Sequence, residues 1–173
     1  YIIRATYTHM YSCTDSTKLV VVGALECSNV LVKRKNKDIF NLEYGHWWLE
    51  RGSESYGWWP KGLSEKMGEQ ATLTEQLWNT FTGVEGELNG VTDYRGGTLT
   101  RDPHHGDPYD EIIDVYILSH RTRDEAWEDL RTFAQSYEAG WSWPFGDNCN
   151  TFQMDMLEAG EYMTESECEE LFE

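Results

Sequence analysis

The residues best suited to chemistry lie at positions 146–153, which read Gly-Asp-Asn-Cys-Asn-Thr-Phe-Gln. A thiol is nucleophilic as its thiolate, and the unpaired N–H groups at a helix N-terminus stabilise that anion. Either Asp147 or Asn148 can serve as the N-cap, which would place Cys149 in the first turn with backbone N–H groups aimed at an oxyanion. Most lone cysteines are inert buried thiols. The flanking residues nevertheless favour a nucleophile at Cys149, at the start of a C-terminal helix.

A reactive cysteine needs a base, and histidine is the usual one. The chain has five histidines, and His46 lies in the strand-like run Gly-His-Trp-Trp-Leu-Glu at positions 45–50. Alternation along a strand places His46 and Trp48 on one face and Leu49 on the other. A strand holds a side chain more rigidly than a loop does, which favours His46 as the proton acceptor. A hydrogen-bonded structural histidine at a sheet edge is the alternative interpretation.

A second cluster of polar residues occupies positions 101–108, Arg-Asp-Pro-His-His-Gly-Asp-Pro. His104 and His105 between two aspartates could ligate a divalent ion, and a metal-dependent hydrolase centred there is one alternative function. Adjacent histidines in an extended chain point apart, however, and Asp-Pro and Gly-Asp-Pro are typical of turns. We therefore expect no metal and no cofactor, and we place His104 and His105 at the rim of a substrate cleft.

Two sequence blocks resemble a known superfamily. Asn148-Cys149-Asn150-Thr151-Phe152 resembles the Asn-Cys-Asn-Thr/His-Phe motif of PPPDE isopeptidases and is similar to the Asn-Cys-Glu-His-Phe motif of lecithin:retinol acyltransferase relatives. Both groups belong to the circularly permuted branch of the NlpC-type papain-like superfamily, in which the catalytic histidine precedes the cysteine. The segments 46–50 and 55–60 resemble the histidine strand and the returning strand of its bacterial members.

The resemblance implies a cysteine hydrolase in which Cys149 and His46 cleave an amide or peptide bond through a thioester intermediate. It implies a peptidoglycan amidase or peptidase, or a secreted bacterial toxin domain, with a PPPDE-like isopeptidase or a thiol acyltransferase as alternatives. The expected partners are a peptide or peptidoglycan-type substrate and a cognate inhibitor or immunity protein. The expected location is secreted or in the periplasm of a target cell.

In this superfamily a polar residue on the strand after the histidine orients the imidazole ring. A turn of even length would put Ser55 on the face of His46, and a turn of odd length would put Glu54 there. Ser55 is the prediction and Glu54 the alternative. The other residues expected to line the cleft are Asn148, Trp141 and Trp143.

The elements that position these residues belong to an α+β fold, a small antiparallel sheet packed with helices in a permuted papain-like arrangement. One domain spans residues 1–173, with a long loop insertion at about 83–110 that accounts for the wide spacing from His46 to Cys149. The basic cluster 33–37 is expected to be a turn or an exposed edge. The expected strands cover residues 17–25, 29–32, 44–50, 53–59 and 111–119, and the expected helices begin near Thr72, Thr122, Asn148 and Thr164.

Composition excludes some classes of function. The chain has 173 residues with 14 basic and 31 acidic side chains, a net charge of −17, which disfavours nonspecific binding to nucleic acid or anionic membranes. Residues 1–40 carry six basic and three acidic side chains, which leaves −20 on residues 41–173 and predicts neutral or cationic substrates. A noncatalytic acidic module that binds a cationic protein is the remaining alternative. The sequence contains no run of 18 apolar residues, so it predicts no membrane-spanning helix.

The ends and the cysteines leave two questions open. The first residue, Tyr1, predicts a processed product or a domain of a longer protein. A disulfide between Cys13 and Cys27 is compatible with the sequence, which does not decide it.

Overall fold

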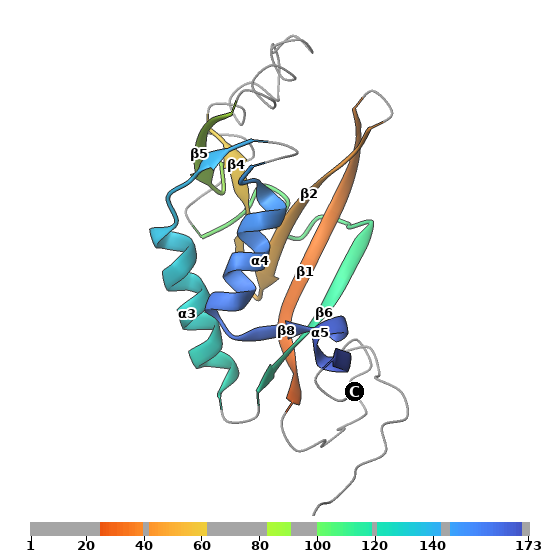
Figure 1. The fold of residues 1–173 in the computed structure, drawn as a ribbon, viewed down its shortest axis with the longest axis vertical. Coiled ribbons are helices and arrows are strands. Elements are labelled where there is room, and N and C mark those ends of the chain that lie inside the picture. The colour runs from red at the N-terminus through yellow and green to blue at the C-terminus, as the bar shows by residue number, and fades with distance from the viewer. Residues whose placement is uncertain are drawn as a thin grey trace, which may run out of the picture.

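The computed structural model describes residues 25–39, 42–61, 83–90, 100–118, 121–142 and 146–170. These residues form a mixed α+β fold with two antiparallel sheets and few helices, which confirms the expected class (Figure 1). The strands are β1 (Leu25–Ile39), β2 (Leu42–Arg51), β3 (Glu54–Tyr56), β4 (Trp58–Pro60), β5 (Val84–Leu88), β6 (Glu111–Leu118), β7 (Gly140–Trp141) and β8 (Tyr162–Thr164). The helices are α3 (Arg123–Ser136), α4 (Cys149–Ala159) and α5 (Glu165–Glu170).

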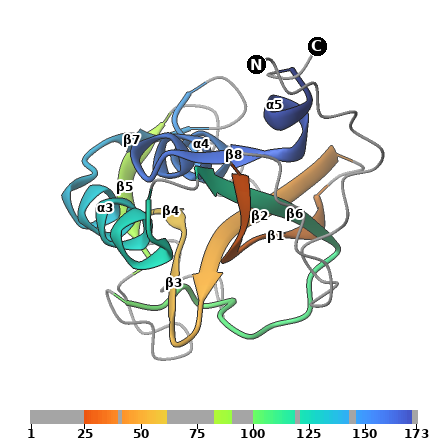
Figure 2. The same cartoon turned by 90° about the horizontal axis from the view of Figure 1, so that it is seen from below.

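The larger sheet has the strand order β3-β2-β1-β6-β8, and the smaller one the order β4-β5-β7. Helices α3 and α4 lie on one side of the larger sheet, and the segment that leads into β6 runs along the other side (Figure 2). None of the helices among the described residues is long and apolar enough to cross a membrane.

The basic cluster 33–37 does not form the expected turn but belongs to strand β1. Lys33 and Arg34 pair with β2 on one side and with β6 on the other, whereas residues 35–37 pair with β2 and have no register partner on β6. The strand accepts them because its cations find acidic partners on neighbouring elements. Lys33 pairs with Glu50 at 3.0 Å and Lys35 with Asp107 at 3.3 Å.

The expected strands 44–50 and 53–59 form a hairpin made of β2 and β3. Their two-residue turn begins at Gly52, whose φ of +58° favours glycine, and the register places Glu50 opposite Ser55. After Gly57 the chain leaves the larger sheet and forms β4, which pairs with β5 in the smaller sheet. Strand β5 lies within the expected loop 83–110, so the first part of that segment is regular structure.

Local capping signals locate the helices after β6. Thr122 and Glu125 form a capping box at the start of α3, where the sequence predicts a helix to begin. Asn148 caps α4, and Glu167 accepts hydrogen bonds from both the backbone N–H and the hydroxyl of Thr164 at the start of α5. The helix expected from Thr72 lies outside the described residues, as do residues 17–24 of the first expected strand.

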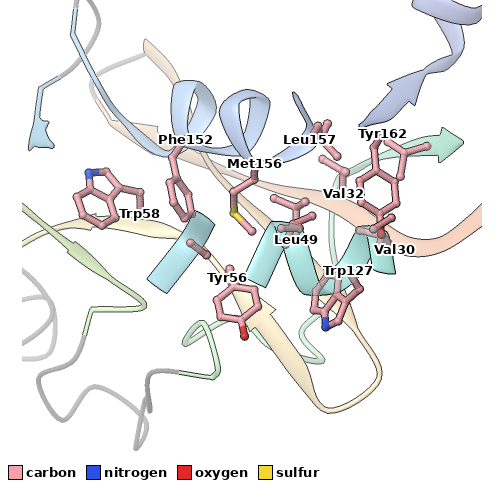
Figure 3. Close-up of a cluster of buried hydrophobic side chains, with 14 of the residues drawn as sticks. Val30, Val32, Leu49, Tyr56, Trp58, Trp127, Phe152, Met156, Leu157 and Tyr162 are labelled. Carbon is pink, nitrogen blue, oxygen red and sulfur yellow. The ribbon is translucent and has the colours of Figure 1, made fainter. Parts of the chain in front are cut away.

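The hydrophobic core fixes α4 against β2. Phe152 and Met156 point from α4 toward Leu49 and Tyr56, and all four side chains are fully buried (Figure 3). Trp58 packs on Phe152 with ring centroids 5.4 Å apart. Burial of side chains of this size contributes on the order of 2 kcal/mol each, so the helix axis is held firmly. The N-terminus of α4, where Cys149 lies, is thereby placed beside β2.

Candidate active site

Cys149 is the first residue of α4 and is buried. Its position follows from the cap: the Asn148 side-chain oxygen accepts a hydrogen bond from the Asn150 N–H at 2.9 Å. The Asn148 N–H in turn donates to the Thr151 hydroxyl at 2.7 Å. Among the described residues nothing accepts a hydrogen bond from the Cys149 N–H, one of the amides that a helix leaves unpaired at its start.

His46 lies on β2 beside this helix end. Within β2, only Leu49–Arg51 pair with β3, so within the described part of the chain the edge of β2 at His46 has no strand partner on that side. The thiol of Cys149 approaches this edge: it donates to the Gly45 carbonyl at 3.5 Å and lies near enough to the His46 side chain to help raise the pKa of that histidine. The ring of Trp59 packs on His46 with centroids 4.0 Å apart.

Asp102 supplies the carboxylate that faces His46. Its Oδ2 lies 2.9 Å from His46 Nε2 and accepts a second hydrogen bond, at 2.7 Å, from the Trp59 indole N–H. Its Oδ1 accepts from the His104 N–H at 2.8 Å. Because Asp102 occupies Nε2, the nitrogen of His46 that remains for Cys149 is Nδ1.

Gly57 makes the contact between Asp102 and His46 sterically possible. A Cβ atom at this position would lie 2.1 Å from Asp102 Oδ2 and 2.8 Å from His46 Nε2, so a residue with a side chain would separate the pair. Asn89, which is fully buried with φ +57°, fixes the chain at this point. Its Oδ1 accepts from the Gly57 N–H at 2.9 Å, and its Nδ2 donates to the Ser55 carbonyl at 3.0 Å.

Ser55 shares the face of His46, as a turn of even length requires, but it contacts the backbone of Asp102 rather than the histidine ring. The Asp102 N–H donates to Ser55 Oγ at 2.8 Å, and the Ser55 N–H donates to the Thr100 carbonyl at 2.9 Å. Glu54 points elsewhere and accepts hydrogen bonds from the side chains of Arg131, Trp127 and Tyr56. The side chain that contacts the His46 ring in the expected place of Ser55 is therefore Asp102, which the sequence offered only as an aspartate flanking the two histidines.

The electrostatics of the pair favour a charged imidazole. Burial alone would lower the pKa of His46, but the charge of Asp102, its hydrogen bond and the adjacent Cys149 outweigh this and raise the pKa to about 9. Burial acts on Asp102 in the opposite direction, yet the proximity of His46 and hydrogen bonds from His46, Trp59 and His104 keep its pKa below the ordinary value. At neutral pH the buried pair is thus imidazolium and carboxylate.

The other predicted residues lie around this centre in different ways. His104 is buried, bonds to Asp107 at 3.0 Å and has its ring centroid 5.5 Å from that of His46, so it packs behind the site. His105 is half-buried, with Nδ1 3.9 Å from Glu50. Trp141 belongs to the hydrophobic core, and the Asn148 side chain is used in capping.

The remaining expectations concern Trp143, the disulfide and the metal alternative. Trp143 and Cys13 lie outside the described residues, while Cys27 carries a free thiol. No group of three His, Cys, Asp or Glu side chains in the described ranges is arranged to hold a metal ion.

In comparisons with known proteins, no family model, curated protein or solved structure matches the chain. The chemistry follows from the site itself. A thiol at a helix N-terminus, a buried histidine and a carboxylate that contacts the histidine are the three groups that a nucleophile, base and orienting residue of a triad require.

Proposed function

We propose that this protein is a cysteine hydrolase of the circularly permuted papain-like type, with Cys149, His46 and Asp102 as its catalytic residues. The observation that carries the proposal is the placement of the Cys149 thiol beside the His46 side chain, whose Nε2 lies 2.9 Å from a fully buried carboxylate. The order along the chain, with the histidine strand before the cysteine helix, is the order that the permuted superfamily would have.

In the proposed reaction, the proton of the Cys149 thiol resides on His46 Nδ1, so that a thiolate lies beside an imidazolium. The thiolate attacks the carbonyl carbon of an amide, and the Cys149 N–H donates to the developing oxyanion. His46 then gives its proton to the leaving nitrogen, which departs as an amine and leaves a thioester on Cys149. Water, deprotonated by His46, hydrolyses the thioester, releases a carboxylic acid and restores the thiolate and the imidazolium. Asp102 holds the ring and stabilises the imidazolium throughout.

The first substrate to test is a peptide amide of the peptidoglycan type, with the protein acting as a secreted toxin domain that a cognate inhibitor would block. An isopeptide bond, or transfer of the acyl group to an acceptor other than water, would pass through the same thioester. These reactions use the same three residues, so the triad can be tested before the substrate is known.

Alkylation by iodoacetamide at pH 7, followed by peptide mass spectrometry, tests the nucleophile. Cys27 is the internal control because it is more exposed than Cys149 and accessibility alone would make it react first. We expect the buried Cys149 to react faster, and His46→Gln to remove its advantage. Faster labelling of Cys27 in the native protein would contradict the proposal.

Hydrolysis tests the reaction itself. Purified peptidoglycan is incubated with the wild-type chain and with Cys149→Ala, and new amino groups and soluble fragments are measured. Release by the wild-type chain alone is expected. Equal release by the Cys149→Ala variant would exclude Cys149 as the nucleophile.

A further inference from the structure

Arg34 extends across the sheet beside the proposed nucleophile. It lies on β1 opposite Trp47 of β2, and its guanidinium carbon is 5.5 Å from the Trp47 ring centroid. Its side chain passes over Gly45, since a Cβ atom at Gly45 would lie 2.2 Å from Arg34 Nε and 3.0 Å from Cγ. Only glycine at this position leaves room for the arginine.

Gly45 is also the residue that Cys149 contacts, because the thiol donates to its carbonyl at 3.5 Å. Arg34 and Cys149 therefore flank a single residue of β2, with the cation over its Cα and the thiol at its oxygen. A group of the substrate that lies over Gly45 while its carbonyl carbon meets Cys149 would come next to the guanidinium.

The hydrogen-bonding capacity of Arg34 is only partly used. Nη1 donates to Glu111 at 2.6 Å, and this glutamate is 46% exposed. Nε is buried and has no hydrogen-bond partner among the residues that the structure describes. A guanidinium carries five donors and binds carboxylates through two of them at once, so Arg34 retains donors for a second carboxylate.

The two lysines next to Arg34 in the sequence form ion pairs with other acidic residues. Lys33 and Lys35 alternate with Arg34 along β1, lie on the opposite face and pair with Glu50 and Asp107. Arg34 is thus a local positive charge on the helix side of a chain whose net charge is −17. The overall acidity predicts neutral or cationic substrates, whereas the surroundings of Cys149 favour an anionic group.

We propose that Arg34 is a specificity-determining residue that binds a carboxylate of the substrate beside the bond attacked by Cys149. The inference rests on the proposed function and narrows its substrate to amides or peptides that carry a free carboxylate near the scissile bond. That carboxylate belongs either to an acidic side chain or to the C-terminus of the peptide.

Two alkylating agents of similar size test the proposal without a known substrate. Iodoacetate carries a carboxylate and iodoacetamide does not, so the ratio of their rate constants at Cys149 reports a cation beside the thiol. In Arg34→Gln this ratio should fall roughly threefold or more, as expected for the loss of one unit charge close to the reacting thiol. Arg34→Lys keeps the charge and should retain most of the wild-type ratio.

Arg51→Gln is the matched control, because Arg51 is also a strand arginine over a tryptophan ring and paired with an exposed acid, Asp124. Its ratio should equal that of the wild type. An unchanged ratio of the iodoacetate and iodoacetamide rate constants in Arg34→Gln, with Cys149 still reactive, would overturn the proposed role of Arg34 and leave the proposed function intact. A wild-type Cys149 that reacts with neither reagent would refute the proposed function.

Competition then separates the two sources of the carboxylate. N-acetylalanine, with a free terminal carboxylate, and the α-amide of N-acetylglutamic acid, with a side-chain carboxylate, are compared as protectants of Cys149 against iodoacetamide. Protection by one of them that is lost in Arg34→Gln supports the proposal and identifies the source. Equal protection in the wild type and Arg34→Gln would contradict it.

Discussion

Replacing Asp102 with asparagine should lower the pKa of His46 from about 9 to below 6.5. His46 is fully buried, and burial by itself disfavours the imidazolium, so the raised value depends on the charge and hydrogen bond of Asp102, with a further contribution from Cys149. Asparagine keeps the shape of the side chain, and its oxygen can still accept a hydrogen bond from Trp59 or His104. The negative charge is the property that the substitution removes.

The size of the effect follows from the two pKa values. A rise from 6.5 to about 9 corresponds to about 3 kcal/mol of interaction that favours the charged imidazole in the folded protein. Because the folded pKa of His46 is raised, this stability is complete below pH 6.5 and is lost as the pH rises through 9. The folded pKa of Asp102 is lowered, so its contribution is present above its ordinary value of 3.8 and is lost as the pH falls. The Asp102→Asn variant should therefore lose most stability near pH 5 to 6, and the loss should shrink above pH 9.

Nuclear magnetic resonance titration of isotope-labelled histidine measures the pKa of His46, and urea unfolding at pH 6 and pH 10 measures the stability. Asp107→Asn is the matched control: it makes the same chemical change in the same segment, but at a residue that bonds to His104 and Lys35. Its His46 titration should match the wild type. A His46 midpoint near 9 in Asp102→Asn would refute the assignment of Asp102 as the cause.

Three further changes test the surroundings of the site. Gly57→Ala should displace the Asp102 carboxylate and slow alkylation of Cys149 roughly tenfold or more. Gly140→Ala, whose Cβ would lie 3.5 Å from the nearest atom, is the control and should leave the alkylation rate unchanged. Equal alkylation rates in the two variants would contradict the steric role of Gly57. Asn89→Gly keeps the left-handed backbone but removes two buried hydrogen bonds, so it should lower the free energy of unfolding, measured in urea, by about 2 kcal/mol. An unchanged urea midpoint of unfolding would contradict the role of the Asn89 side chain. Burial would raise the pKa of Glu50, but hydrogen bonds from the Gly106 N–H and the Lys33 side chain lower it, so Glu50→Gln should destabilise the protein at pH 7 by about 2 kcal/mol. That difference should shrink as the pH falls below 4.5, and a difference that is constant from pH 7 to 3 would contradict the ionic contribution.

The parts of the site that depend on local signals were predictable from the sequence. Asn148 as an N-cap and Cys149 in the first helical turn follow from capping preferences within four residues. His46 on the face opposite Leu49 follows from strand alternation alone. Both inferences need only neighbouring residues, because helix starts and strand faces are determined over short distances along the chain.

Asp102 could not be predicted in the same way. It lies 56 residues after His46, and its position depends on how residues 100–102 pair with the outer edge of β3. Its local context, Asp-Pro-His-His, favours a turn over a metal site, and neither interpretation points to His46. Strand β5 was missed for a similar reason. Its sequence, Val-Glu-Gly-Glu-Leu, has little intrinsic preference for a strand and forms one between β4 and β7.

The basic cluster of β1 connects these observations. Its alternate cations hold the segment that carries Asp102: Lys35 binds Asp107, and Lys33 binds Glu50, which also accepts from the Gly106 N–H. On the other face of the same strand, Arg34 lies beside Gly45 and Cys149. One strand therefore positions the orienting carboxylate with one face and the proposed carboxylate-binding group with the other. This double use gives a physical reason for a run of cations in the central strand of a protein that is otherwise strongly acidic.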